Sequence, residues 1–437
     1  SKSSNFPETL NYTLRSVALA NAADYSKMRR IIAEDFDWSL AIVPTLSDIC
    51  LHCIVKNFEE QPIFEELTST EKDFLQEKLS LSIPLSVTAN LVSDGNYWKR
   101  CCEQRWDFCE VSNYGNSWKR MYFERHLVNI IELFIPAVTD PKAVLNIIPL
   151  CRNYVKKLNI SQLLPPVLPP QQEEEDDSDL ALKNKDDEPS IDHFDFSILL
   201  DKLTNLEELR LVYKVKQCGM NFEWNMFEMS DRDCESLAKA LQSCKTLKIL
   251  SIKSSYIDDK KCRLLMKYLL DHPSLKELDL SYNEIGDSGA RGICNLLTRS
   301  KLEILNMCDN RISCSGAKAI AHMLSKEDST LLSLNLRLNR VRDEGGQAIG
   351  EALLNNRTLL DLHLGANVMT EHTAFTLSKV LLHNKTLKTI NLSCNKLGEL
   401  GVQALKEAMS ANKSLIECDI SLTEEEEETA SLINQVV

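Results

Sequence analysis

The second half of the sequence repeats itself at a nearly constant interval. The pattern L-x-x-L-x-L-x-x-N-x-L begins eight times, at Leu206, Leu247, Leu275, Leu302, Leu331, Leu359, Leu387 and Leu415. Successive starts lie 41, 28, 27, 29, 28, 28 and 28 residues apart. A fixed period of this length is typical of a solenoid, because one unit cannot bury its apolar face alone and must stack on its neighbours.

Each unit has a strand-like half and a helix-like half. The alternating apolar residues of Leu278–Leu280 predict a short strand whose leucines point into the core. The Asn that follows, such as Asn283, falls where the chain must turn, and its amide can bond to the neighbouring turn. Stacking therefore predicts an asparagine ladder, with Ser255 in place of Asn in the first regular unit. The helical half starts with a small pair such as Gly289–Ala290, which we expect to bring helix and strand backbones close together.

A period near 28 with a full helix resembles the ribonuclease-inhibitor class of leucine-rich repeats. The resemblance implies an α/β horseshoe over residues 193–423, with parallel strands inside and helices outside. Its concave sheet would present a mixed polar face suited to a protein partner. The candidate contact residues on that face are Glu277, Asp279, Ser281, Asn306, Arg337, Asp361, His363 and Asn391.

The first interval exceeds the period by 13 residues, since 41 minus 28 is 13. The additional residues fall between about Lys214 and Phe227 and include Phe222 and Trp224. Two interpretations stay open: Phe222, Trp224 and Phe227 either seal the open end of the solenoid or form a docking surface.

Residues 1–164 contain no repeat, and prolines separate short segments of helical periodicity, such as Tyr25–Phe36 and Lys72–Leu79. This pattern predicts an all-α N-terminal domain. Residues 165–192 are rich in proline and acidic residues and are predicted to be a solvated linker. An acidic tail, 424–437, ends the chain.

The net charge of -14 comes from two segments. Gln171–Asp195 contributes -9 and Glu424–Glu428 contributes -5, so the remainder is neutral overall. No basic field is left to attract nucleic acid or an anionic membrane. The most apolar stretch, Leu127–Val138, is too short and too polar to span a bilayer. The 15 cysteines have no framework spacing, and we expect reduced thiols in a cytoplasmic protein.

Two short motifs resemble a catalytic sequence and a metal-binding sequence, but each has a simpler structural explanation. Gly286–Gly289 reads G-D-S-G, but the same four positions recur as Ser313–Gly316, Arg342–Gly345 and Gly398–Gly401 in other units, so the repeat explains the motif better than a catalytic triad does. Cys50–Cys53 has metal-like spacing, but no second C-x-x-C pair accompanies it, and buried thiols are expected there. We therefore predict no catalytic residues, no cofactor and no metal, and hence no enzyme.

The segment Asn96–Leu127 contains two Trp-Lys-Arg triplets, at Trp98 and Trp118. Two helices packed through aromatic side chains explain them more simply than binding to single-stranded nucleic acid. Residues 67–127 resemble the F-box-like helical module. Trp98 and Trp118 are the candidate contact residues of this segment.

The F-box-like segment, the acidic linker and the solenoid together resemble leucine-rich-repeat subunits of the nexin-dynein regulatory complex of cilia and flagella. Tyr97–Cys102 and Trp118–Leu127 carry this resemblance most sharply. It implies a non-catalytic axonemal scaffold that links doublets and helps to regulate dynein-driven ciliary and sperm flagellar motility. The implied partners are other subunits of the complex and, indirectly, inner-arm dyneins and doublet microtubules.

Two alternative functions, from other classes of protein, remain open. An F-box-like module followed by repeats is also the plan of a substrate receptor of a cullin-type ubiquitin ligase. A Ran-GTPase activator shares the repeat class and would need a catalytic loop residue, for which Arg340 and Arg342 are candidates.

Overall fold

A computed structural model describes residues 29–31, 41–166, 192–220 and 224–423. Phe222, most of the predicted linker (167–191) and the acidic tail (424–437) lie outside the described residues. The chain divides into two compact units, Ser1–Tyr122 and Phe123–Val437, which are considered separately below.

The first unit is mainly helical. Two of its helices start with capping boxes, in which Thr45 pairs with Asp48 and Thr68 with Glu71. Tyr97, Trp98 and Phe58 are almost completely buried, and the rings of Tyr97 and Trp98 pack edge to face with 5.2 Å between their centroids. Its helices are α2 (Leu46–Asn57), α3 (Ser69–Lys78), α4 (Leu85–Leu91), α5 (Asn96–Arg105) and the start of α6 (Trp118–Glu132).

A short antiparallel pair, β1 (Arg29–Ile31) and β2 (Ala41–Val43), departs from the expectation of an all-helical region. It also replaces part of the helix expected over Tyr25–Phe36, whose remaining residues lie outside the described ranges.

The second unit contains a nine-stranded parallel sheet in strict chain order, as the repeat predicts. Its register aligns the same repeat position in each strand, so that Leu278 lies beside Leu305, which lies beside Leu334. The strands are β3 (Lys157–Ile160), β4 (Glu208–Leu211), β5 (Ile249–Ile252), β6 (Glu277–Asp279), β7 (Ile304–Asn306), β8 (Ser333–Asn335), β9 (Asp361–His363), β10 (Thr389–Asn391) and β11 (Glu417–Asp419).

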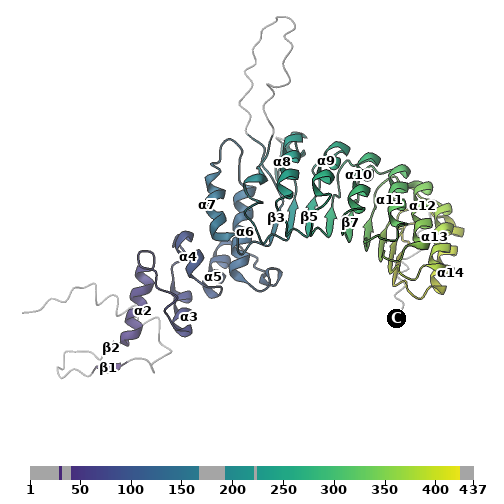
Figure 1. The fold of residues 1–437 in the computed structure, drawn as a ribbon. Coiled ribbons are helices and arrows are strands. Elements are labelled where there is room, and N and C mark those ends of the chain that lie inside the picture. The colour runs from purple at the N-terminus through teal and green to yellow at the C-terminus, as the bar shows by residue number, and fades with distance from the viewer. Residues whose placement is uncertain (1–28, 32–40, 167–191, 221–223, 424–437) are drawn as a thin grey trace, which may run out of the picture. The chain divides into compact units, whose positions relative to one another are not determined.

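Helices cover one face of this sheet, and the core lies between the two layers (Figure 1). The opposite face is called the concave face below. The covering helices are α8 (Asp231–Leu241), α9 (Asp259–Leu269), α10 (Asp287–Leu297), α11 (Cys314–Leu324), α12 (Arg342–Asn355), α13 (Glu371–His383) and α14 (Gly398–Ala411). The α/β repeat architecture expected from the period is confirmed.

The sheet starts earlier than the expected boundary at residue 193. β3 pairs in parallel with β4, and the second unit begins at Phe123, so part of the region assigned to residues 1–164 belongs with the repeats. The proline-rich and acidic tract therefore falls between two neighbouring strands, whereas the sequence suggested a link between domains. The sequence did not reveal that β3 belongs to the repeat sheet, because the tract separates β3 from β4 by far more than one period.

The edge of β3 is capped by side chains of α6. Glu124 Oε1 accepts the backbone N–H groups of Lys156 and Lys157, at 2.8 and 3.0 Å. Glu132 Oε1 accepts the backbone N–H and the hydroxyl of Ser161, at 2.7 and 2.6 Å. An edge strand otherwise leaves its donors without partners, and these carboxylates cover them. Helix α7 (Lys142–Cys151) joins α6 to β3.

The asparagine ladder is present. Asn339 Nδ2 donates to the carbonyls of Met307 and Leu336, and its Oδ1 accepts the N–H of Ile312. Corresponding bonds are made by Asn283, Asn310, Asn367 and Asn395. Ser255, at the first regular position, accepts the N–H of Tyr213 at 3.0 Å. Each turn is therefore tied to the unit before it.

A second asparagine column lies at the turns from helix to strand. Asn384 Nδ2 donates to the carbonyl of Leu353, and its Oδ1 accepts the N–H groups of Thr386 and Leu387. Asn356 and Asn412 bond in the same way. In the sequence these residues are noticeable only as N-x-[ST] triplets, and their repeat spacing is the signal that could have revealed the column.

The small residues at the helix starts bring successive helices together, whereas we expected them to bring helix and strand together. A Cβ atom added to Gly345 would lie 2.8 Å from the Ala317 Cβ of the preceding helix and 2.7 Å from Val341 Cγ1. Thr373 replaces Gly at this position in α13 and is accommodated opposite Gly346. Its hydroxyl donates to Asp343 at 2.6 Å.

Candidate binding surfaces of the repeat unit

The concave face presents the strand positions that alternate with the buried leucines. Six of the eight predicted contact residues are accessible there, each partly covered by its neighbours: Glu277, Asn306, Arg337, Asp361, His363 and Asn391. The other two, Asp279 and Ser281, are 4% and 0% exposed, so the expectation that they contact a partner is wrong. Asp279 Oδ1 accepts the N–H and hydroxyl of Ser281, and its Oδ2 lies 2.7 Å from Lys253 Nζ.

Several of the accessible amides also have a structural role. Asn306 Oδ1 accepts the N–H of Cys308, and Asn391 Oδ1 accepts the N–H of Ser393, so each closes the turn after its strand. Asn391 Nδ2 donates to Asp419 at 2.6 Å.

Charges on the concave face are largely paired near its start and acidic near its end. Arg210 contacts Glu208 at 2.5 Å and Glu277 at 3.9 Å. Towards β11, the charges of Asp361, Glu417 and Asp419 and that of Arg337 act on His363. Burial lowers the pKa of His363, and the charge of Arg337 lowers it further, against the opposing effect of Asp361. The imidazole is thus biased towards its neutral form.

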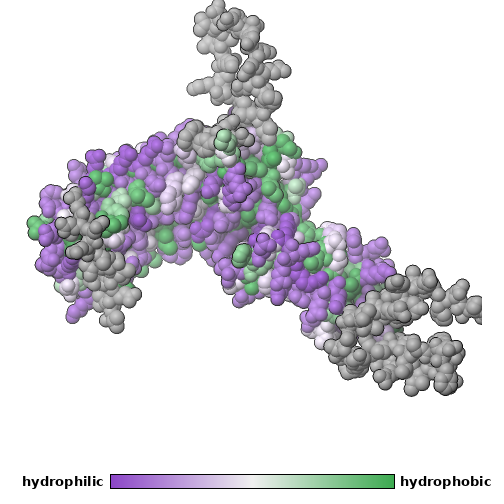
Figure 2. Space-filling model, turned by 180° about the vertical axis from the view of Figure 1, so that it is seen from behind, coloured by the Kyte–Doolittle hydropathy of each residue, from purple (hydrophilic) through white to green (hydrophobic). Residues whose placement is uncertain are grey.

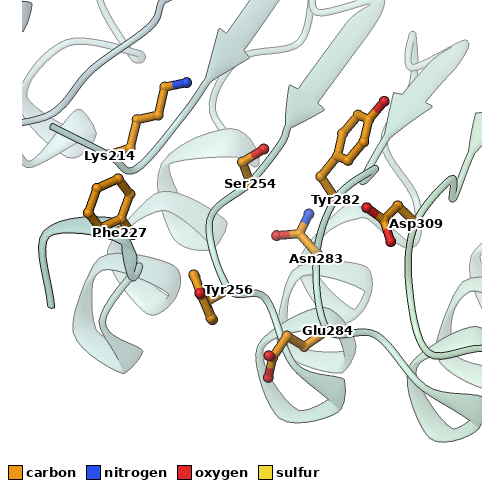
Figure 3. Close-up of a pocket in the computed structure, with 8 residues that line it drawn as sticks. All are labelled: Lys214, Phe227, Ser254, Tyr256, Tyr282, Asn283, Glu284 and Asp309. Atoms are coloured by element: carbon orange, nitrogen blue, oxygen red, sulfur yellow. The ribbon is translucent and has the colours of Figure 1, made fainter. Parts of the chain in front are cut away.

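The insertion after β4 borders a groove. Trp224 and Phe227 bound a short 3₁₀ helix, η4 (Trp224–Phe227), and the N–H of Val215 bonds to the carbonyl of Met226. Phe227 lines a cavity of about 340 Å³ (Figure 3). Its other lining residues come from the turns after β4 to β7: Lys214, Ser254, Tyr256, Tyr282, Asn283, Glu284 and Asp309.

The sealing interpretation of this insertion is not supported, because β3 and α6 already cover the edge of β4. The insertion instead forms one wall of a groove on the rim of the unit.

Trp98 is 0% exposed, and its indole N–H donates to the carbonyl of Val92 at 3.1 Å. It is therefore a core residue, and the expectation that it contacts a partner is wrong. Trp118 is half-buried at the start of α6, with Lys99 Nζ 5.8 Å from its ring centroid. Tyr122 packs on Trp98 at 5.2 Å and on Trp106 at 5.8 Å, as expected for helices joined through aromatic side chains.

The G-D-S-G motif belongs to a column of aspartates. Asp287 accepts the N–H groups of Ser313 and Gly316 from the next unit, at 2.8 and 2.9 Å. Asp259 does the same for Gly286 and Gly289. The motif is therefore explained by stacking.

Cys50 and Cys53 are exposed on α2, so the expectation of buried thiols was wrong there. Among the described residues no group of three metal-binding side chains occurs. Most of the remaining cysteines pack as small apolar groups, and burial raises the pKa of Cys234 and Cys294 to about 12. Within the same ranges no helix has the length and apolarity that crossing a bilayer requires.

These features define a leucine-rich-repeat protein in which each unit pairs a parallel strand with a helix. A family model described as Leucine Rich repeat matches residues 271–294, 327–350 and 383–406.

The chain is similar to curated proteins named Dynein regulatory complex subunit 5. The Macaca fascicularis protein is 50% identical over 276 residues, covering 63% of this chain and 55% of that protein. The Mus musculus protein is 52% identical over 266 residues, covering 61% and 53%. The Chlamydomonas reinhardtii protein is 34% identical over 224 residues, covering 51% and 50%. The chain thus spans about half the length of the curated relatives it matches.

Solved structures show more distant similarity. An internalin from Listeria monocytogenes is 21% identical with a TM-score of 0.32, covering 52% of this chain and 64% of that one. The Caenorhabditis elegans tropomodulin C-terminal domain is 15% identical with a TM-score of 0.26, covering 42% and 93%. None of the relatives' names supports the ubiquitin-ligase or GTPase-activator alternatives, and Arg340 and Arg342 are simply exposed.

Proposed function

We propose that this chain is a non-catalytic structural subunit of the axonemal dynein regulatory complex. The observation that carries the proposal is identity of 50–52% over more than 260 residues to mammalian proteins named as subunit 5 of that complex. The similarity to a Chlamydomonas reinhardtii protein of the same name is consistent with a role in cilia and flagella. In this role the chain acts as a scaffold between doublets and helps to regulate dynein-driven motility.

The geometry suits a scaffold. A nine-stranded parallel sheet held by two asparagine columns and one aspartate column is a rigid surface, because every unit is bonded to the next. The accessible concave-face residues, among them Asp361 and His363, are candidates for contacts with other subunits of the complex. Inner-arm dyneins and doublet microtubules are then indirect partners.

The test is expression of the tagged chain in ciliated cells that lack the endogenous protein. We expect the chain to remain on the axoneme after detergent extraction and to restore the beat, as measured by high-speed video. A tagged leucine-rich-repeat protein without a ciliary role serves as the control. A chain that washes out with the soluble fraction and leaves the beat unchanged would contradict the proposal.

A further inference from the structure

The groove beside η4 is bordered by aromatic side chains in an unfavourable backbone conformation. Tyr282 has φ +60° and is 49% exposed, and Tyr256 has φ +52° and is 38% exposed. Non-glycine residues in this left-handed region cost about 1–2 kcal/mol each, and Asn, Asp or Gly tolerate it best. Each tyrosine is only partly buried, so packing within the chain offsets this cost only in part.

Other repeat units show that the backbone conformation of Tyr282 belongs to the turn. The residue before the ladder asparagine is left-handed throughout, with φ +52° at Asp309, +56° at Leu338 and +57° at Cys394. The turn therefore imposes the left-handed backbone conformation, whichever side chain the position carries. Tyr282 occupies this position next to the groove, with Asp309 in the following unit (Figure 3).

The groove has a positive end and a negative end. No hydrogen bond or ion pair joins the Lys214 ammonium or the Asp309 carboxylate to another of the described residues. The lysine follows β4 and the aspartate follows β7, with Tyr256 and Tyr282 on the turns between them. Three strand spacings separate the two ends by about 14 Å of backbone. On the face shown in Figure 2, hydrophilic residues predominate and hydrophobic ones are interspersed among them.

We propose that this groove binds an extended segment of another subunit of the dynein regulatory complex, with the pattern acidic-x-apolar-x-basic. The proposal rests on the proposed function. An extended chain rises about 3.3 Å per residue and places residues i, i+2 and i+4 on one face, so the two charged residues would be about 13 Å apart. The acidic residue pairs with Lys214, the apolar one packs between Tyr256 and Tyr282, and the basic one pairs with Asp309.

The key variant is Tyr282→Asn. Asn is well tolerated in the left-handed region, so the free energy of unfolding should stay equal or rise, whereas the aromatic contact is lost. The matched control is Leu338→Asn, which makes the same kind of change in the same turn conformation two units further on, outside the groove. Lys214→Glu and Asp309→Lys test the charged ends.

The assay is binding of the purified full chain to demembranated axonemes from cells lacking the endogenous protein. We expect Tyr282→Asn and each charge reversal to weaken retention by about tenfold or more, and Leu338→Asn to bind like the unsubstituted chain. Equal retention of Tyr282→Asn and the unsubstituted chain would overturn this inference alone. Failure of the unsubstituted chain to bind would overturn the proposed function, and the inference with it.

A photo-reactive phenylalanine derivative at position 282, which keeps an aromatic ring there, identifies the occupant. We expect a cross-link to a subunit segment in which an acidic and a basic residue flank an apolar one at the stated spacing. A cross-linked segment without that pattern would overturn the proposed chemistry.

Discussion

Glu124 Oε1 lies 3.0 Å from the backbone nitrogen of Lys157, so a side chain of α6 caps the edge strand of the repeat sheet. The same oxygen accepts the N–H of Lys156, and Glu124 is almost fully buried. The cap satisfies donors that a solenoid would otherwise leave open at its first strand. It also explains why the repeats need no separate sealing element after β4.

Loss of this cap should destabilise the repeat unit. Glu124→Leu removes the acceptor for two backbone donors, and we expect the free energy of unfolding to fall by about 2–3 kcal/mol. Glu124→Gln keeps one acceptor oxygen and should cost about 1 kcal/mol. Urea unfolding followed by circular dichroism measures both, with the exposed Glu351→Ala as control. A loss below 0.5 kcal/mol for the leucine variant, on the order of surface substitutions, would contradict the capping role.

The ladder asparagines should be far less replaceable than asparagines on the helices. Asn339→Ala leaves the carbonyl of Met307 and the N–H of Ile312 without their partner, and should lower the free energy of unfolding by about 2–3 kcal/mol. Asn295→Ala, on the exposed side of α10, should change it by less than about 0.5 kcal/mol. Equal effects at the two positions in the same unfolding experiment would rule out a ladder contribution.

His272 should make stability depend on pH. Burial lowers its pKa, while its bond to the carbonyl of Cys244 opposes that shift. Because the folded pKa lies below the unfolded value of 6.5, the neutral ring stabilises the fold above about pH 6.5. This contribution is lost as pH falls from there through the folded pKa. We expect chemical unfolding at pH 7.5 and at pH 5 to show the loss.

A matched substitution isolates that effect. His272 occupies the repeat position that Asn356, Asn384 and Asn412 occupy in later units. His272→Asn should therefore keep a donor to the Cys244 carbonyl and remove this part of the pH dependence. His383→Asn, an exposed site, is the control. An unchanged slope of stability against pH in the His272 variant would show that another group titrates.

Two glycines in α10 should respond oppositely to alanine. A Cβ on Gly289 would lie 2.5 Å from Ile285 Cγ2 and 2.8 Å from Asp259 Oδ1, so Gly289→Ala should cost about 1–3 kcal/mol. A Cβ on Gly292 meets the Arg263 side chain at 3.1 Å, and that flexible chain can move. Gly292→Ala should be neutral or stabilising by up to about 1 kcal/mol, because alanine favours helix. Thermal unfolding compares the stability of the two variants. A larger loss of stability for Gly292→Ala than for Gly289→Ala would contradict the assignment of the close contact to Gly289.

The periodic part of the fold was readable in advance. Eight starts at nearly equal spacing predict the strands β4 to β11, their parallel order and the ladder through Asn283 to Asn395. The second asparagine column carries the same spacing and was recoverable from it. The first strand was not, because the acidic tract interrupts the period between β3 and β4.

The candidate site was predicted less completely. Strand alternation placed Glu277, Asp361 and His363 on an accessible face, but it could not show that Asp279 and Ser281 are buried by bonding to each other and to Lys253. In the sequence, only the aromatic insertion indicated a surface at the place where the groove lies. Its other wall comes from turns up to 95 residues away, between Lys214 and Asp309.

The sequence by itself determined the repeat, because the period, the alternation of apolar residues and the turn asparagines are local patterns that can be read within each unit. Only the tertiary structure decided what caps the sheet, which polar residues are buried and where Lys214, Tyr282 and Asp309 share one groove. Those outcomes depend on which distant segments meet. Pairing and burial there are set by the free energy of the whole stack, which no single unit encodes.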